Sequence, residues 1–571
     1  MKKVLAVLLA TATTLSLVAC GAKEAPASVA PAASESKEVE ASVSEETPAV
    51  EEATEASVEG MENGKFTETR HISVEVYDRD GATPANDNVW TDWIKAQMLE
   101  RYNVEVEFVA VPRWTEVDQI NNLLAAGDAP DLCYTYDYAT IQTYDNMGGV
   151  TDLAPLLAQY KDLLPELWAW LGDENIYYDQ DPATGKVIAI EGRRNNTYRI
   201  NTFVRKDWLD KLGLAAPTTT AEFEAMLVAF RDNAETLLGA DASKMVPFEV
   251  TKDVGWTAAP LIESKMDPAI SDRELYVNGF DDRKFTENGT KEALKILNKW
   301  YNDGLLWKDF AIEETSVGDD LAKAGFVGAF CQSYDYPFRN GVDSFNAMLK
   351  ANVSEDAKFI SVNCFEDKNG KYSHYEYSAA GDRKSFFPAT NDEPLASLLY
   401  LNFISSPEVV EYLQIGEEGI NHTVNADGSI AVAAVSEENA AYTMNSGNNI
   451  DLTMTCNGLR LQSEELTSKS LAYGYAEVDP ADVVLAMQLA DVDVISPKNV
   501  SVGTIEAEAE GSALTEKRDE VFCKAIVAAV ADFDAVWDGG MAEYLAAGGQ
   551  AIIDERLEKW IATYGDVDML P

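Results

Sequence analysis

Histidine is scarce in this chain, which has three histidines among 571 residues. His71, His374 and His422 are far apart in sequence, and none belongs to an H-E-x-x-H pair that could bind zinc. The sequence also lacks a P-loop, a G-x-S-x-G elbow and a G-x-G-x-x-G fingerprint. These absences remove the common signatures of zinc enzymes, nucleotide-binding enzymes and serine hydrolases. We expect no catalytic residues, no metal site and no cofactor.

Cysteine is also scarce, and the six cysteines include no C-x-x-C pair. Disulfide frameworks belong mainly to small domains that cannot build a large core, and this chain is long. We therefore expect the thiols after Cys20 to be free and buried. One disulfide bridge stays possible, and the sequence cannot choose its partners.

Basic residues are few, since 45 lysines and arginines stand against 97 aspartates and glutamates, a formal net charge of −52. This balance argues against a nucleic-acid partner, because the phosphate backbone needs a basic footprint. Solubility at a cell surface explains the acidity most simply. A local basic pocket could still recognise a carboxylate, although surface arginines are the commoner case. The candidates are Arg113, Arg193, Arg194, Arg339 and Arg460.

Long apolar runs are missing after the first residues of the chain. Lys2 and Lys3 precede an apolar segment at residues 4–10 that is too short to span a bilayer, which is typical of a secretory signal. Residues 17–21, Leu-Val-Ala-Cys-Gly, resemble the lipobox of bacterial lipoproteins. The resemblance implies a signal peptide at residues 1–20 and an acylated, palmitate-bearing Cys20 that anchors the protein to the outer face of the cell membrane. An ordinary cleaved signal with an incidental cysteine is the alternative.

The segment after Cys20 has few residues that could pack in a hydrophobic core. Residues 21–65 are mainly Ala, Ser, Glu, Val, Thr and Pro, and the first aromatic residue is Phe66. Such a composition cannot offset the entropy of ordering, and glutamates that repel one another keep the chain extended. We expect a disordered acidic tether at residues 21–65, of a length that suggests a Gram-positive cell.

The rest of the chain has strand and helix signals in alternation. Strand patterns at 71–77, 104–109 and 132–136 enclose helical periodicities at 89–102 and 116–125. This order predicts parallel βαβ units and an α/β fold. Roughly 500 residues are more than one core usually sustains, which predicts two lobes. Ligands of such sheets bind at the carboxyl ends of the strands.

Several motifs along this part resemble one family. They are Gly127–Asp131 (GDAPD), Val204–Phe223 (VRKDWLDKLGLAAPTTTAEF), Tyr301–Leu306 (YNDGLL), Ala324–Ala329 (AGFVGA), Gly416–His422 (GEEGINH), and Tyr544–Gln550 (YLAAGGQ) with Ile553–Glu555 (IDE). In this order they are similar to the extracellular solute-binding proteins of ABC importers, in the large lipoprotein branch of the carbohydrate type. The glutamate at position 417 departs from the family pattern, which more often has isoleucine there.

The resemblance implies a two-lobed periplasmic-binding-protein fold, type II-like, with hinged lobes and an interlobe ligand cleft. Lobe 1 would comprise residues 66–195 with 379–455, and lobe 2 residues 196–378 with 456–571. The chain would cross between lobes near 191–201, 377–381 and 453–458. The implied function is capture of an oligosaccharide and its delivery to the permease of an ABC transporter, by a monomer that is not an enzyme.

Sugar sites combine aromatic platforms with planar donors and acceptors. Aromatic and polar residues that follow the expected strands are therefore the candidate ligand contacts. They are Asp87, Asn88, Trp90, Trp114, Tyr136, Tyr138, Trp256, Tyr334, Tyr336, Asn457 and Arg460. For each single aromatic the alternative is core packing. The helical pattern assigns Trp93, Trp168, Trp170, Trp208, Trp300 and Trp560 to the core.

Two other classes of protein stay open as alternatives. A surface glycoside hydrolase would need a pair of carboxylates in the cleft, and a peptide-binding receptor would need a surface that reads backbone or repeats. The acidic residues 179–186 were compared with a calcium loop, but the glycine is one position late for an EF-hand and no glutamate closes the loop. A β-turn is the better interpretation there.

Overall fold

A computed structural model describes residues 58–79, 84–280, 285–313, 315–378, 380–433, 436, 451–496 and 498–570. The chain divides into two units, Met1–Glu55 and Ala56–Pro571. The predicted signal peptide, Cys20 and the tether up to residue 57 lie outside the described residues. No helix of the described part is long and apolar enough to cross a membrane.

The end of the predicted tether is ordered. Strands β1 (Met61–Glu62) and β2 (Lys65–Phe66) form a small antiparallel hairpin, and Phe66 is buried. The expectation of disorder up to residue 65 is therefore wrong for this stretch, because Val58 and Met61 pack against the core that buries Phe66.

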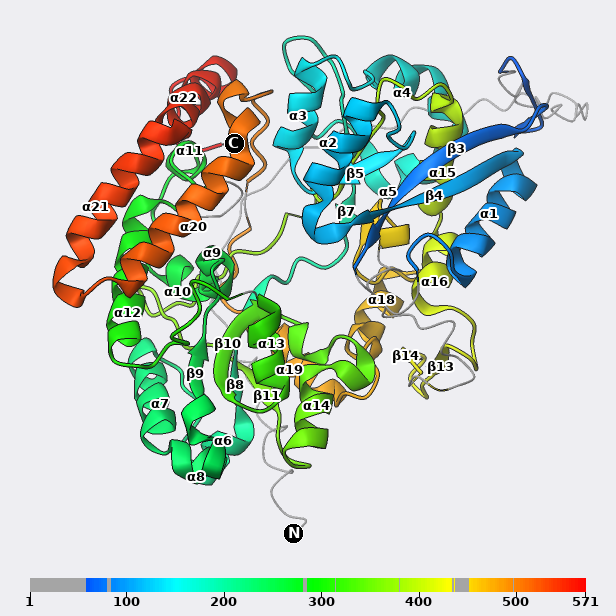
Figure 1. Cartoon of the computed structure of the whole chain (residues 1–571). Coiled ribbons are helices and arrows are strands. Elements are labelled where there is room, and N and C mark those ends of the chain that lie inside the picture. Colours follow the sequence, from blue (N-terminus) through cyan, green and yellow to red (C-terminus); the bar gives the residue numbers. More distant parts are fainter. Residues whose placement is uncertain are drawn as a thin grey trace, which may run out of the picture. The chain divides into compact units, whose positions relative to one another are not determined.

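The first βαβ unit matches the sequence prediction. Strands β3 (Arg70–Asp78) and β4 (Val104–Pro112) pair in parallel along their whole length, and α1 (Val89–Tyr102) connects them (Figure 1). Helix α1 begins at Asn88, whose side chain accepts hydrogen bonds from the backbone of Trp90 and Thr91. Helix α2 (Glu116–Ala126) follows β4 and ends at Gly127, whose positive φ of 75° suits glycine.

A second sheet of this part is antiparallel. Strand β12 (Lys384–Phe386) lies between β5 (Cys133–Thr135) and β6 (Ile190–Glu191), so residues distant in sequence meet here. A parallel bridge between Val74 and Leu132 continues β3 toward β5. The carboxyl ends of β3, β4 and β5 are thus neighbours, as the α/β prediction requires.

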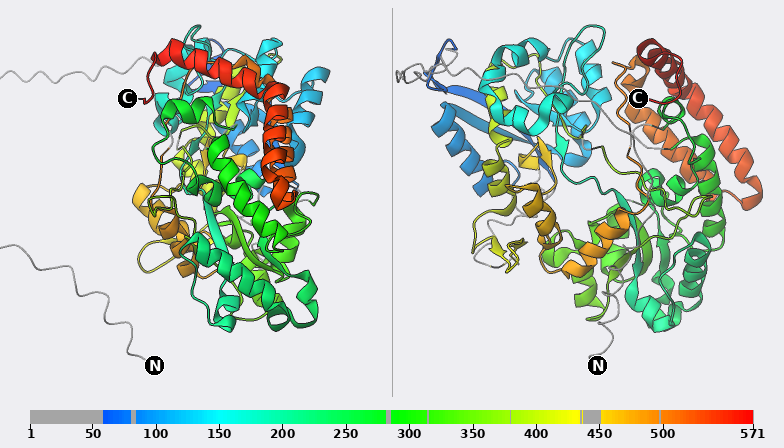
Figure 2. Two further views of the ribbon diagram at one scale, coloured as in Figure 1. Left: turned by 90° about the vertical axis from the view of Figure 1, so that its left-hand side faces the viewer. Right: turned by 180° about the vertical axis from the view of Figure 1, so that it is seen from behind.

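The other main sheet has four strands. Their order is β11 (Phe359–Val362), β8 (Ile200–Arg205), β10 (Val327–Ser333) and β9 (Val246–Glu249), and β10 pairs with β9 in parallel and with β8 antiparallel. Helices α12 (Glu287–Asn302), α20 (Gly511–Val527) and α21 (Phe533–Tyr544) pack side by side in this part (Figures 1 and 2).

The remaining elements fall into two groups by the core that they join. Around β3 to β6 lie α3 (Tyr138–Asn146), α4 (Ala154–Tyr160), α5 (Pro165–Ile176), α15 (Pro394–Ile404), α16 (Pro407–Ile415), α18 (Glu464–Ser470), β13 (His422–Val424) and β14 (Ile430–Val432). Around β8 to β11 lie α6 (Lys206–Leu212), α7 (Thr220–Asp232), α8 (Ala234–Leu238), α9 (Val254–Thr257), α10 (Ala259–Ser264), α11 (Asp272–Val277), α13 (Thr315–Lys323), α14 (Phe345–Asn352), α19 (Pro480–Ala490) and α22 (Gln550–Tyr564).

Three segments connect the two cores. The first joins Ile190 to Ile200, and the second joins Phe365 to Phe386. The third leads from Leu461, in the core of β3 and β4, to Ala472 in the other core. Just before it, Cys456–Asn457 pairs in parallel with Arg193–Arg194 of the first segment. The first two segments contain the crossings expected near 191–201 and 377–381, and the crossing expected near 453–458 stays a prediction. The proposed lobe boundaries otherwise stay a prediction.

The five cysteines of the described residues are free thiols. Cys133, Cys331, Cys364 and Cys456 are buried, and Cys523 is half-buried. Burial raises the pKa of Cys331, Cys456 and Cys523 to about 12, so these thiols stay protonated at neutral pH.

Candidate ligand site

Aromatic rings and arginines gather at the carboxyl ends of β3, β4 and β5. Trp114 is 71% exposed and lies near two guanidinium groups, those of Arg79 at 5.9 Å and Arg113 at 5.4 Å from its ring centroid. Arg113 also lies 4.8 Å from the ring centroid of Tyr136, and Tyr136 stacks on the buried Tyr77. Three strand ends therefore present one group of rings bound to two cations.

Each of these arginines forms an ion pair with a carboxylate. The guanidinium of Arg79 donates two hydrogen bonds to Asp451, at 2.6 and 3.1 Å, and that of Arg113 donates to Glu116 at 2.5 Å. Asp451 and Glu116 are both buried. Burial raises the pKa of Glu116, while the charge of Arg113 opposes that rise. The cations are thus fixed in orientation and largely compensated.

The first and second crossing segments continue the group of rings. The guanidinium of Arg194 lies 3.9 Å from the ring centroid of Tyr377 and donates to Asp382 at 2.7 Å. Arg199 lies 5.8 Å from the ring of Trp256 and 5.9 Å from that of Tyr377, and it donates to the buried Glu263.

Charges beneath the rings connect the two groups. Arg194 interacts electrostatically with Tyr136, and the buried Arg383 lies 3.7 Å from Asp382 and 3.5 Å from Asp451. Burial opposes ionisation of Asp382, but Arg194 and Arg383 together hold the pKa of its carboxyl below the usual value. The charged layer therefore keeps the rings of both groups in fixed positions. We call Trp114, Tyr136, Tyr377 and Trp256 the ring row.

A third group follows strand β10. The hydroxyl of Tyr334 accepts a hydrogen bond from Asn196 at 2.6 Å and lies 3.1 Å from the hydroxyl of Tyr475, which donates to Asp335. Arg339 donates to Asp335 at 2.6 Å. This network ties the first crossing segment to the core of β8 to β11.

The other predicted contacts have mainly structural partners. Trp90 is 3% exposed and packs against Tyr412, because α1 turns this side of the helix to the core. We therefore remove Trp90 from the candidate contacts. Asn88 is occupied as the cap of α1, and Asp87 beside it is exposed.

Four further candidates are also engaged. Tyr138 donates to the carbonyl of Asp179 at 3.2 Å, and Tyr336 donates to Asp319 at 2.7 Å. Asn457 lies in β15 (Cys456–Asn457), which pairs with β7 (Arg193–Arg194). Arg460 lies 3.8 Å from the ring of Trp170 and donates to the carbonyl of Ser405. Their roles as ligand contacts stay predictions.

Sequence reasoning missed several members of the site. Arg79, Arg199 and Tyr377 were not among the predicted contacts, nor were the carboxylates beneath them. Arg79 follows the first strand directly, in the same way as Arg113 follows the second, so its position was a usable signal. Asp451 gave no local signal, because only the fold brings it to Arg79 across 372 positions of sequence.

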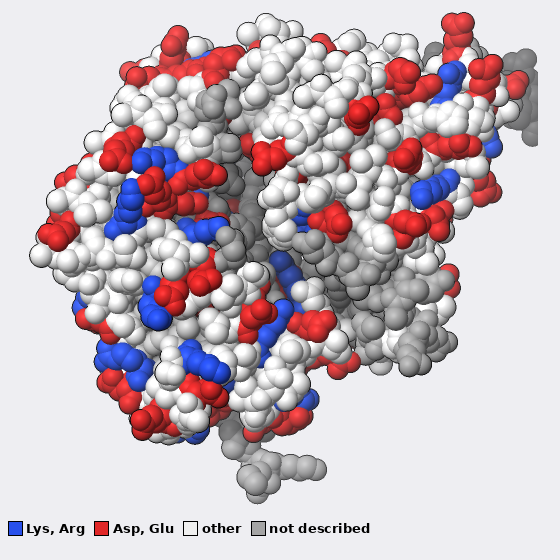
Figure 3. All heavy atoms as spheres, viewed as in Figure 1, with Lys and Arg blue, Asp and Glu red and all other residues white. Residues whose placement is uncertain are grey.

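The surface is hollowed on the face drawn in Figure 3, between the part that carries α12 and α20 to α22 and the part that carries α3 and β3 to β5. Lysine or arginine side chains are visible inside the hollow. The described residues contain no group of three or more histidines, cysteines, aspartates and glutamates that could hold a metal ion.

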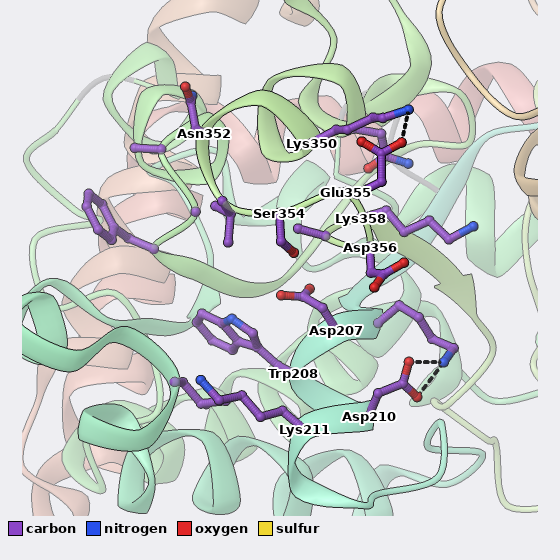
Figure 4. Close-up of a pocket in the computed structure, with 18 of the residues that line it drawn as sticks. Asp207, Trp208, Asp210, Lys211, Lys350, Asn352, Ser354, Glu355, Asp356 and Lys358 are labelled. Carbon is purple, nitrogen blue, oxygen red and sulfur yellow. Dashed lines mark hydrogen bonds and ion pairs between the residues drawn. The ribbon is translucent and has the colours of Figure 1, made fainter.

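A separate surface cavity of about 1090 Å³ lies within the core group of β8 to β11 (Figure 4). Charged side chains from α6, α14 and the loop after α14 line it, and ion pairs join Lys206 to Asp210 and Lys350 to Glu355. Trp208 contributes to the wall but is buried. The ion pairs of the cavity are typical of an ordinary solvated surface.

No protein-family model matches the chain. Among curated proteins, lipoprotein LipO of Bacillus subtilis (strain 168) is 26% identical over 276 residues, which are 48% of this chain and 52% of LipO. The polygalacturonan/rhamnogalacturonan-binding protein YtcQ of the same organism is 23% identical over 337 residues, which are 57% of this chain and 62% of YtcQ. The chain thus matches only about half to three fifths of the length of these relatives.

Solved structures agree with the chain over a longer stretch. The alginate-binding protein AlgQ2 without calcium has a TM-score of 0.64 at 15% identity, over 88% of this chain and 100% of AlgQ2. The S. pneumoniae ABC-transporter substrate-binding protein FusA in complex with kestose has a TM-score of 0.61 at 13% identity, over 87% of this chain and 100% of FusA. The predicted two-lobed α/β fold and the resemblance to carbohydrate-type solute-binding lipoproteins are confirmed.

Proposed function

We propose that this chain is a substrate-binding protein that captures an oligosaccharide between its lobes and delivers it to the permease of an ABC transporter. The ring row carries the proposal. Tyr136 packs against one core, Trp256 packs against the other, and Tyr377 lies on a segment between them. The exposed Trp114 follows strand β4 and lies beside Arg113, which also contacts Tyr136. Rings in such a row suit the apolar C–H faces of successive sugar units, while guanidinium and amide groups suit the hydroxyls.

Capture proceeds by closure of the lobes around the crossing segments. A ligand that contacts rings on both lobes stabilises the closed form over the open form. The hydrogen-bonded chain from Asn196 through Tyr334 and Tyr475 supports this mechanism, because it links a crossing segment to one lobe. The bound sugar is then released to the permease unchanged.

The protein acts at the outer face of the cell membrane. Acylated Cys20 holds it there, residues 21–57 serve as the tether, and one monomer serves one permease complex. The motif at residues 17–21 supports this location, as does the name of the curated relative LipO, a lipoprotein.

The four carboxylates that pair with arginines of the ring row are poorly suited to hydrolysis. Asp451, Glu116, Asp382 and Glu263 each accept a hydrogen bond from an arginine and are buried beneath the rings. A glycoside hydrolase needs one carboxyl group that donates a proton and a second that acts on the sugar, both facing the substrate. The names of the similar proteins mention polygalacturonan, alginate and kestose, so they leave the charge of the sugar open.

A ligand screen tests the proposal. The full chain in a polyoxyethylene detergent, which carries no sugar, is screened by thermal shift against oligosaccharides and oligopeptides, and each hit is recovered and chromatographed. We expect one glycan class to raise the melting temperature, since a ligand of the native state stabilises it by mass action, and to be recovered intact. A shift with peptides alone, or recovery of cut sugar, would favour the peptide receptor or the hydrolase.

A matched pair of variants connects the hit to the ring row. Trp256→Ala removes a half-buried ring of the row, and Trp168→Ala removes a half-buried ring on α5 that pairs with Lys161 and Asp173 instead. We expect Trp256→Ala to weaken binding about fivefold or more and Trp168→Ala to leave it unchanged. Equal effects of the two variants would count against this position of the site.

A further inference from the structure

Five arginines of the candidate site share one arrangement. Each guanidinium lies between an aromatic ring and a carboxylate that is nearly or fully buried, with side-chain exposures from 0% at Asp451 to 12% at Asp335. The arginines are Arg79, Arg113, Arg194, Arg199 and Arg339, with Asp451, Glu116, Asp382, Glu263 and Asp335 as their respective partners. The arrangement recurs on strand ends of both cores and on the first crossing segment.

Each of the five arginines has a carboxylate partner that compensates its charge, and Asp382 and Asp451 also lie near the buried Arg383. Recognition of a carboxylate depends on a cation whose charge is free to pair with it, usually through two parallel hydrogen bonds. Arg79 already donates two such hydrogen bonds to Asp451. A uronate that approached Arg79 or Arg194 would also meet the charge of Asp451 or Asp382, at a distance and dielectric where like charges repel appreciably.

The same arrangement fits an uncharged sugar. A guanidinium that is fixed by a carboxylate holds the adjacent ring in one orientation, as Arg194 does for Tyr377 and Arg113 does for Tyr136. The N–H groups of such an arginine that the carboxylate does not use can donate to hydroxyl oxygens, while the arginine–carboxylate pair carries no net charge.

Arg193 and Arg460 differ from the other five, since neither forms an ion pair with a carboxylate within the described residues. Both lie on the ring of Trp170, at 4.9 and 3.8 Å from its centroid. Their guanidinium groups donate to the carbonyls of Trp170 and Ser405. They belong to the packing of α5 and the end of α15 and not to the ring row.

We propose that the ligand is a neutral oligosaccharide and not a polymer of uronic acids. This inference rests on the proposed function, and it assigns a role to the buried carboxylates, which is to cancel the charge of the arginines that orient the rings.

Pairs of sugars that differ only in charge test the inference. Calorimetry on the full chain compares oligogalacturonides and oligomannuronates with their carboxyl-reduced products, in which –COOH becomes –CH₂OH, and with gluco-, manno- and fructo-oligosaccharides. We expect a neutral glycan to bind. Any reduced product should bind at least about tenfold more tightly than its acid. The Kd of the neutral ligand should change less than about twofold between 50 and 500 mM salt.

The outcomes separate the two proposals. A uronate that binds more tightly than its reduced product, with an affinity that falls as salt rises, would overturn the neutral ligand and leave the receptor in place. Failure of every glycan to bind would overturn both.

A pair of variants tests whether the carboxylate partners of the arginines cause the preference for a neutral sugar. Glu116→Gln keeps the shape of the side chain but frees the charge of Arg113, whereas Glu105→Gln removes a carboxylate of β4 that pairs with the exposed His71. We expect Glu116→Gln to reduce the preference for the neutral sugar at least about threefold and Glu105→Gln to leave it unchanged. An unaltered preference in a folded Glu116→Gln protein would contradict the proposal that the carboxylates set this preference by compensating the arginines. If Glu116→Gln does not fold, Asp335→Asn, which frees the charge of Arg339, repeats the test.

Discussion

Arg194 and Tyr377 lie on different segments that connect the two cores, and the guanidinium of the one is 3.9 Å from the ring centroid of the other. The contact joins residues 194 and 377 at the point where the ring row passes from one core to the other. Because both residues lie where a hinge motion would act, the packing of the crossing segments and the shape of the ligand site depend on each other.

Trp114→Ala is expected to weaken ligand binding without loss of stability. The ring is 71% exposed, so the folded state loses little packing, whereas a stacked sugar would lose about 1 kcal/mol, or about fivefold in Kd. Calorimetry of binding and of thermal unfolding on the same preparation measures both effects. A drop in the melting temperature comparable to that of a core variant would contradict the exposed platform.

Trp90→Ala is expected to lower the stability of the protein without weakening ligand binding. Its ring is 3% exposed and packs against Tyr412, so truncation should lower the free energy of unfolding by about 3–5 kcal/mol. Urea unfolding measures this loss. If the variant kept wild-type stability and lost binding, Trp90 would have to return to the ligand site.

His374 is expected to make stability depend on pH. Burial, with a smaller contribution from the nearby Arg199, lowers its pKa to about 4 against the opposing charge of Asp493. The unfolded chain, with a pKa of about 6.5, binds the proton more readily, so stability from this residue is complete above pH 6.5 and falls as pH decreases toward 4. The total is on the order of 3 kcal/mol. Urea unfolding from pH 4 to 7 should show a shallower slope for His374→Asn than for the wild type, and parallel curves would refute the assignment.

Gly381→Ala is expected to destabilise the protein more than the same change at Gly370, a matched glycine of the same crossing segment. Gly381 has a φ of +81°, and an added Cβ would lie 2.8 Å from the ring of Tyr178. Gly370 has a φ of +75° and open space around the same position. We expect about 1 kcal/mol for Gly370→Ala from the backbone alone and about 1–3 kcal/mol more for Gly381→Ala from the clash. Equal losses in urea unfolding would exclude the clash.

Cys20→Ala is expected to release the protein from the membrane. The variant cannot be acylated, so it should move from the membrane fraction to the culture medium in an immunoblot of fractionated cells. Cys523→Ala removes a half-buried thiol of the folded body and should remain with the membrane. Membrane retention of the Cys20 variant would favour an ordinary signal with an incidental cysteine.

The local elements of the first βαβ unit could be predicted from sequence because their signals are local. Helix α1 begins at its cap Asn88 and follows the predicted periodicity, and α2 ends at Gly127 because a left-handed residue is needed there. Trp90 shows the limit of this reasoning. It follows a strand and an Asp-Asn pair, as a ligand residue would, but the rotation of α1 against α15 and α16 buries its ring.

The sequence by itself determined the fold class, the order of the elements and the family resemblance, because strand and helix periodicity, caps and contiguous motifs depend on neighbouring residues. The tertiary structure decided which aromatic rings are exposed and which charges are compensated. Those properties arise from contacts such as that of Arg79 with Asp451, which are separated by 372 positions and meet only in the folded chain. The charge of the ligand site therefore follows from folding and not from composition, which is strongly acidic throughout.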